Sequence, residues 1–244
     1  MSPEHLAALT AGIFVISLLY SSVGHAGASG YIAVMSLLSL APAVIKPTAL
    51  TLNILVASIG TWQFWRAGHF SWCLFWPFAV LSVPFAFIGG YLNLPSHLFK
   101  MLLGAILLYS ALRFLLRAAP EKEPNAPSRW QALLSGGGIG FLSGLTGTGG
   151  GIFLTPLLLF MNWARVKPAA AVSALFILVN SVAGLLGNIS STQQFPTFAL
   201  VLVAAAALGG SIGSYYGSRR LDPVAIKRFL ALVLLIAGTK LILT

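Results

Sequence analysis

Long apolar runs separated by short polar stretches occupy almost the whole chain. Most runs approach the roughly 20 residues that an α-helix needs to cross a hydrocarbon core about 30 Å thick. Two runs, 27–41 and 150–163, are short for a full crossing, which predicts half-helices or buried pieces. The pattern as a whole predicts helical segments at 6–22, 27–41, 48–65, 71–92, 98–116, 130–146, 150–163, 168–187, 197–217 and 226–243.

One polar stretch, residues 117–129, divides the chain into halves of similar length. It predicts a linker between an N-terminal membrane repeat at 1–116 and a C-terminal membrane repeat at 130–244. Short motifs recur at matching places in the two halves, which indicates an internal repeat. The matched pairs are Gly24–Gly27 with Gly147–Gly150, Lys46–Ala49 with Lys167–Ala170, and Ile88–Tyr91 with Ile212–Tyr215. Five crossing segments in each half make the repeats inverted, which we expect, whereas four would make them parallel.

Composition places these segments in a lipid bilayer. Hydrophobic residues make up 58% of the chain and charged residues only 7%, whereas a soluble domain carries about 25% charged residues. The fold class predicted is therefore an all-α polytopic membrane protein. The net charge of +10 does not indicate nucleic-acid binding, because the basic residues are scattered at the ends of apolar segments. The expected partner is the bilayer itself, and a homo-oligomer is compatible with the sequence.

The basic residues also predict an orientation. They gather around the linker, at Arg165 with Lys167, and between Arg219 and Arg228. In the ten-segment scheme these three clusters fall on one side of the membrane. The positive-inside rule then puts the linker in the cytoplasm and both termini outside, in a multi-pass protein of the plasma (inner) membrane.

Several chemical groups are missing from the apolar segments. The four acidic residues, Glu4, Glu121, Glu123 and Asp222, lie in the N-terminal tail or in polar connections. A membrane carboxylate relay is therefore absent, and so are the paired acids of a hydrolase. Cys73 is the only cysteine, which excludes a disulfide or thiolate cluster. We expect no enzyme activity, no metal and no cofactor.

The glycine-rich run at 147–151 is the strongest candidate for a binding site. Glycine costs a helix roughly 1 kcal/mol relative to alanine, and irregular backbone at membrane depth needs protein or a water-filled cavity around it. A broken helix exposes backbone N–H groups and the positive end of a helix dipole, which bind oxyanions. The alternative is close helix packing through small residues. With its weaker repeat partner, the run predicts a substrate site at Gly24, His25, Gly27, Ser29, Gly30, Gly147, Thr148, Gly149, Gly150 and Gly151.

Three polar side chains inside apolar segments extend this prediction. His25 could bind an anion or carry a proton, or it could simply cap broken backbone. Asn53 and Asn180 are predicted to line the substrate path, with hydrogen bonding between helices as the alternative. Lys46 and Lys167 precede prolines and could attract anions, although snorkelling to the interface is the more common role.

The motif Gly-x-Gly-Gly-Gly-x4-Pro-x-Leu at Gly147–Leu158, in a duplicated membrane protein of this length, resembles the TauE/SafE family of sulfite exporters. The resemblance covers both halves, although the first half has Ala26 and Ala28 where glycines could stand. It implies a transporter of sulfite or a related sulfur oxyanion or sulfonate. We expect export by alternating access around the two glycine-rich loops. A passive channel for a small anion or neutral solute is the alternative.

Overall fold

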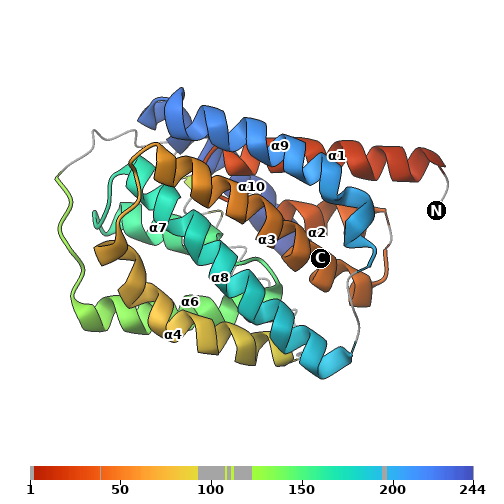
Figure 1. The fold of residues 1–244 in the computed structure, drawn as a ribbon, viewed down its shortest axis with the longest axis horizontal. Coiled ribbons are helices and arrows are strands. Elements are labelled where there is room, and N and C mark those ends of the chain that lie inside the picture. The colour runs from red at the N-terminus through yellow and green to blue at the C-terminus, as the bar shows by residue number, and fades with distance from the viewer. Residues whose placement is uncertain are drawn as a thin grey trace.

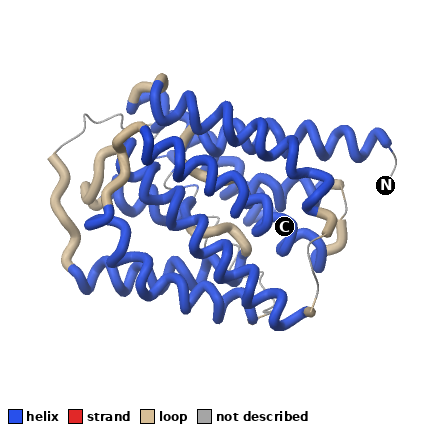
Figure 2. The backbone as a smooth tube through the Cα atoms, in the orientation of Figure 1, coloured by secondary structure: helices blue, strands red, loops and turns tan. Residues whose placement is uncertain are grey.

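The computed structural model describes residues 3–38, 40–92, 108, 111–112, 123–193 and 197–243. Within these residues the chain is helical and contains no strand (Figures 1 and 2). The predicted segment 98–116 lies outside the described residues, apart from positions 108, 111 and 112. The helices are α1 (Pro3–Ser21), α2 (Ala28–Leu37), α3 (Pro42–Arg66), α4 (Trp72–Tyr91), α6 (Arg129–Thr146), α7 (Gly151–Phe160), α8 (Val166–Thr192), α9 (Ala199–Arg219) and α10 (Pro223–Leu243).

The helix lengths agree with a polytopic membrane protein. Five of the described helices are long and apolar enough to span a bilayer, namely α1, α3, α4, α8 and α9. Helices α2 and α7 have 10 residues each, and a rise of 1.5 Å per residue makes each about 15 Å long. That is about half of a hydrocarbon core. The two short segments are therefore half-helices, as the sequence predicts.

Local signals set the helix boundaries. Ser128 and Gln131 form a capping box at the start of α6, and Gly147 ends that helix in the left-handed conformation. Asp222 caps α10, since its Oδ1 accepts a hydrogen bond of 2.6 Å from the N–H of Ala225.

The two halves exchange their fourth helices. Helix α4 of the first half packs against α6 and α8 of the second, and α9 of the second half packs against α1 and α3 of the first. In Figure 1, α3 and α8 run in opposite directions, and so do α1 and α6. Both observations agree with the predicted inverted repeats. We call this exchange of helices the interlock.

Glycines allow the interlocked helices to approach closely. A Cβ atom added to any of three glycines on α6, or to any of three on α9, would lie between 2.0 and 2.3 Å from a backbone carbonyl oxygen of the facing segment. No side chain larger than hydrogen fits there, which is the small-residue packing that membrane helices use. The glycines are Gly136, Gly140 and Gly144 on α6, facing α4, and Gly209, Gly213 and Gly217 on α9, facing α1 and the residue directly after it.

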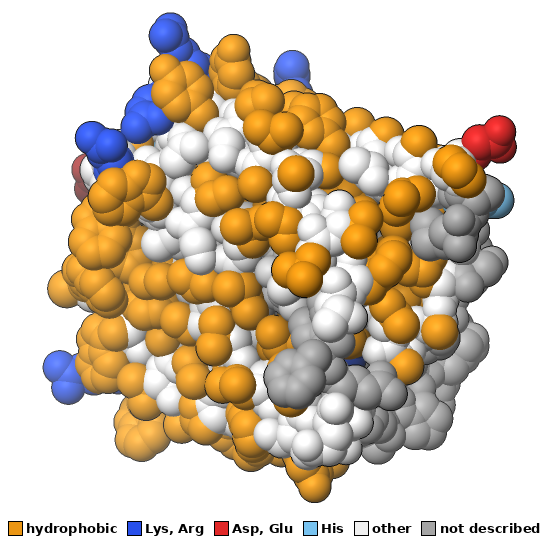
Figure 3. Space-filling model, turned by 45° about the vertical axis from the view of Figure 1, so that its right-hand side comes forward, with side chains coloured by type: hydrophobic (Ala, Val, Ile, Leu, Met, Phe, Trp, Pro, Cys, Tyr) orange, Lys and Arg blue, Asp and Glu red, His pale blue; other side chains and the backbone are white. Residues whose placement is uncertain are grey.

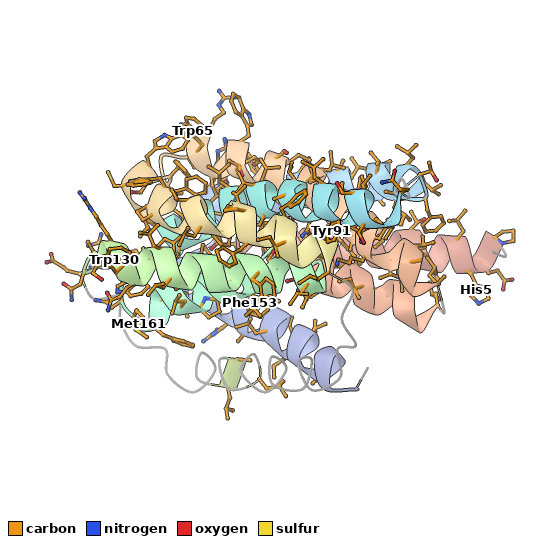
Figure 4. The ribbon with its side chains drawn as sticks, turned by 90° about the horizontal axis from the view of Figure 1, so that it is seen from below. His5, Trp65, Tyr91, Trp130, Phe153 and Met161 are labelled. Atoms are coloured by element: carbon orange, nitrogen blue, oxygen red, sulfur yellow. The ribbon has the colours of Figure 1, made fainter. Side chains whose placement is uncertain are left out.

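Four arginines of the described residues gather at one end of the molecule. Arg66 ends α3, Arg219 ends α9, Arg129 begins α6, and Arg165 immediately precedes α8. Figure 4 places the neighbouring Trp65 and Trp130 at one end and His5 at the other. Figure 3 shows Lys and Arg side chains along one edge of a largely hydrophobic face. We call this the basic end, and its separation from the N-terminus is the arrangement that the predicted orientation requires.

Candidate functional site

The two breaks between helices lie inside the helical bundle. The first glycine loop, residues 22–27, joins α1 to α2, and the second glycine loop, residues 147–150, joins α6 to α7. Residues 22–27 and 147–150 are all buried. Irregular backbone at this depth is thus enclosed by protein, as the energetics of unpaired backbone groups demand.

The second glycine loop has a backbone that only glycine adopts readily. Gly149 and Gly150 have φ angles of +78° and +82°, a region in which a Cβ atom is strained. No hydrogen bond within the described part of the chain engages the N–H groups of these two glycines. Successive N–H groups of this kind form a concave anion-binding surface, and here they precede the positive end of α7.

Asn53 joins the start of α2 to the second glycine loop. This fully buried side chain lies in the middle of α3, and its Oδ1 accepts a hydrogen bond of 3.0 Å from the N–H of Ala28, the first residue of α2. Its Nδ2 is 3.2 Å from the carbonyl oxygen of Thr148 and 3.3 Å from Oγ of Ser181. One amide therefore connects the start of α2, the second glycine loop and α8.

His25 connects the first glycine loop to the second half of the chain. Its Nε2 lies 2.9 Å from Oγ1 of Thr155 on α7, and that hydroxyl donates to Oγ of Ser173 on α8 at 2.7 Å. Since Thr155 gives its proton to Ser173, its oxygen accepts from Nε2–H of His25, which assigns the tautomer. Nδ1 is then the acceptor nitrogen, and this buried atom has no hydrogen-bond partner in the described structure.

The remaining residues predicted in the first half contact helices rather than the second glycine loop. A Cβ atom on Gly24 would lie 2.4 Å from the carbonyl oxygen of Ala170, and Gly27 and Gly30 pack against Ile16. Ser29 donates a hydrogen bond of 3.0 Å to the hydroxyl of Tyr20. These contacts are those of close helix packing.

The remaining predicted residues of the second half have mixed surroundings. Gly147 ends α6 above the side chain of Lys46, while Gly151 contacts Ile177, and a Cβ atom there would lie 3.3 Å from Cδ2 of His25. Asn180 donates to the carbonyl of Phe176 in its own helix at 2.8 Å. Its buried Oδ1 has no partner in the described structure.

Ser143 completes the surroundings of the second glycine loop and was not among the predicted residues. It is fully buried, its Oγ has no partner among the described residues, and its Cβ is 3.3 Å from the position that a Cβ of Gly150 would take. The spacing of four residues from Gly147 places it one helical turn before the loop, and that spacing could have identified it.

Lys46 lies beside this site at the end opposite the basic end. It is partly buried, and its Nζ donates a hydrogen bond of 3.2 Å to the carbonyl oxygen of Gly90, near the end of α4. Its Cγ would be 3.0 Å from a Cβ of Gly147. The cation therefore supports a helix C-terminus and adjoins the second glycine loop.

Comparison with known proteins identifies the relatives of this chain. Residues 9–241 match the family described as sulfite exporter TauE/SafE. A protein of Sinorhizobium fredii named probable membrane transporter protein y4hK is 43% identical over 240 residues, covering 96% of this chain and 97% of that protein. The Bacillus subtilis protein named probable membrane transporter protein YjnA is 26% identical over 253 residues, covering 95% of this chain and 97% of that protein. No solved structure matches. The chain thus belongs to the TauE/SafE family of membrane transporters, as its motifs suggest.

Proposed function

We propose that this transporter carries a small oxyanion, sulfite or a related sulfur oxyanion or sulfonate, across the plasma membrane by alternating access. The substrate binds at the second glycine loop, at the backbone of Thr148, Gly149 and Gly150, with His25 and Asn53 beside it. The observation that carries the proposal is the pair of adjacent N–H groups on Gly149 and Gly150, buried and without a hydrogen-bond acceptor in the described chain.

Energetics favour an anion as the missing partner. A buried donor without an acceptor costs about 1–3 kcal/mol, so two of them favour a ligand that accepts both hydrogen bonds. A sulfur oxyanion offers several oxygens on one compact centre. Backbone donors together with the dipole of α7 bind such a group without a charged side chain.

The second glycine loop is the stronger candidate because the helix that follows it keeps a free N-terminus, whereas a side chain already bonds to the start of the helix that follows the first loop. Asn53 occupies the N–H of Ala28 at the start of α2, whereas no side chain caps α7. We infer that the two loops have diverged, one holding the ligand and the other holding the side chains that frame it.

Export of an anion needs no membrane carboxylate. With a negative interior, moving one anionic charge outward gains roughly 2.3 kcal/mol per 100 mV. The acceptor nitrogen of His25 supports binding of a protonated oxyanion such as bisulfite, whose hydroxyl would donate to it.

Counterflow in proteoliposomes tests the proposal. Purified protein is reconstituted with unlabelled sulfite inside, and uptake of labelled sulfite is measured for the native protein and for Gly150→Ala. At Gly150 a methyl group is strained by φ and would lie 2.9 Å from Cε1 of Phe176, so we expect counterflow to fall at least about tenfold, the effect of losing roughly 1.4 kcal/mol of binding.

Gly138→Ala is the matched control, because no atom lies within 4 Å of its added Cβ. It should transport like the native chain. Normal counterflow in a folded Gly150→Ala variant would refute the site. Rapid flux without saturation or counterflow would instead indicate the passive channel.

A further inference from the structure

A pocket lies at the basic end, away from the glycine loops. It has a volume of about 580 Å³ and opens to the surface. Three helices begin at its wall, with Ser71 preceding α4, Arg129 opening α6 and Arg165 preceding α8. The basic-end pocket is lined by Ser71, Cys73, Leu74, Trp76, Pro77, Pro124, Ala126, Pro127, Arg129, Trp163, Ala164, Arg165 and Pro168.

Its polar side is positively charged. Arg129 and Arg165 are both exposed, and neither is paired with an acidic residue within the described ranges. Other arginines at this end differ, since Arg66 lies over the ring of Trp62 at 5.5 Å and Arg219 over that of Tyr215 at 4.7 Å. The positive ends of α4, α6 and α8 add to the two guanidinium charges. Such a combination favours a phosphate group, which arginine binds in a bidentate manner.

Its other side is apolar and lies at the level of exposed tryptophans. Leu74, Trp76 and Pro77 form this wall, and Trp76 is 52% exposed. Trp72 and Trp130, from the first turns of α4 and α6, are also exposed. Tryptophans at this position mark the boundary between hydrocarbon and headgroups. A ligand with a phosphate beside an apolar tail matches both walls of the basic-end pocket.

The linker wall of the pocket is held by specific hydrogen bonds. Asn162 donates from Nδ2 to the carbonyl of Glu123 at 2.7 Å, and its own carbonyl accepts from the N–H of Asn125 at 2.9 Å. These bonds fix residues 123–127 against the turn between α7 and α8. Pro124 and Pro127 are therefore permanent parts of the wall.

We propose that the basic-end pocket binds the headgroup phosphate of an anionic phospholipid, with Arg129 and Arg165 as its ligands. Basic pockets between membrane helices on the cytoplasmic side recognise such headgroups, and the positive-inside rule predicts that side for this end. None of the lining residues belongs to a glycine loop, so this proposal does not depend on the proposed oxyanion site.

The only cysteine of the chain supplies a probe inside the pocket. Cys73 is exposed and lines it. The protein is placed in nanodiscs of phosphatidylcholine, with or without phosphatidylglycerol, and alkylation of Cys73 by N-ethylmaleimide is followed by mass spectrometry. We expect phosphatidylglycerol to slow alkylation severalfold in the native protein and to have little effect in the Arg129→Gln, Arg165→Gln double variant.

A matched variant separates the site from a general charge effect. Arg66→Gln with Arg219→Gln removes the same charge from the same end but outside the pocket, and it should keep the protection. Equal protection in both double variants would overturn the proposal. Equal protection by soluble glycerol phosphate in phosphatidylcholine discs would also overturn it, in favour of a soluble anion.

Folding of the variants is controlled by a charge-conserving pair. Arg129→Lys with Arg165→Lys retains both charges, and we expect it to keep part of the protection because lysine still attracts phosphate. Native mass spectrometry gives a second readout, in which the native protein retains phosphatidylglycerol and the glutamine variant does not. Two results together would refute the role of the two arginines. In the first, the lysine and glutamine variants lose Cys73 protection to the same extent. In the second, both variants retain as much phosphatidylglycerol as the native protein does.

Discussion

The close contact between α4 and α6 allows a quantitative prediction about stability. At Gly140 an added Cβ would lie 2.2 Å from the carbonyl oxygen of Ser82, whereas carbon–oxygen contacts between membrane helices are normally about 3.3–3.6 Å. Gly140→Ala thus forces the two helices apart by about 1 Å, an overpacking that costs typically 1–3 kcal/mol. Gly138, two residues earlier on the same helix, has no neighbour within 4 Å of its added Cβ.

Both substitutions gain the same helix propensity, about 1 kcal/mol. The difference in stability between the two variants therefore gives the cost of overpacking the contact between α4 and α6. Thermal unfolding in one detergent at one heating rate measures it, because such unfolding is often irreversible and rate-dependent. With roughly 2–4 °C per kcal/mol for a chain of this size, Gly138→Ala should melt on the order of 5 °C above Gly140→Ala and slightly above the native protein. A Gly140→Ala variant as stable as Gly138→Ala would refute the close approach of α4 and α6.

Three further predictions concern single polar side chains. Asn53→Leu leaves the N–H of Ala28 without its acceptor, so it should lower the free energy of unfolding by about 1–3 kcal/mol and lower counterflow, both measured on the purified variant. Lys46→Met should raise the half-saturating sulfite concentration at low and at high salt alike, because salt screens a partly buried charge only weakly; Lys167→Met is the comparison at the opposite end, and equal shifts would contradict a special role for Lys46. Asn162→Gly keeps the left-handed conformation at φ 54° but removes the bond to Glu123, so it should accelerate proteolysis of residues 123–128 in a limited-digestion time course.

The apolar pattern predicted the helices well but not all of their ends. The helix expected at 48–65 begins at Pro42, so that Pro47 lies inside it and removes one backbone hydrogen bond without ending the helix. The helix expected at 168–187 continues to Thr192. Its last turns are polar, but Ser190 and Thr192 donate to carbonyls four residues earlier, so the helix outlasts the apolar run.

For the candidate site, the sequence predicted the donors but not their surroundings. The glycine run follows from composition, because consecutive glycines inside an apolar chain mark broken backbone. That Asn53 joins Ala28 to Thr148 does not follow, since these partners are 25 and 95 residues away. Nor could a motif show that Asn53 bonds to the start of α2 while no side chain caps α7, because this difference arises only from tertiary packing.

The interlock has a consequence for how the protein assembles as it is synthesised. During synthesis the first half enters the membrane alone, and the glycine-lined partners of α4 and α1, on α6 and α9, do not yet exist. Until α6 and α9 are inserted, α1 and α4 must face lipid or each other. Assembly is therefore a late, concerted event rather than the joining of two finished halves. Two separately expressed halves would each lack the packing partners of these helices.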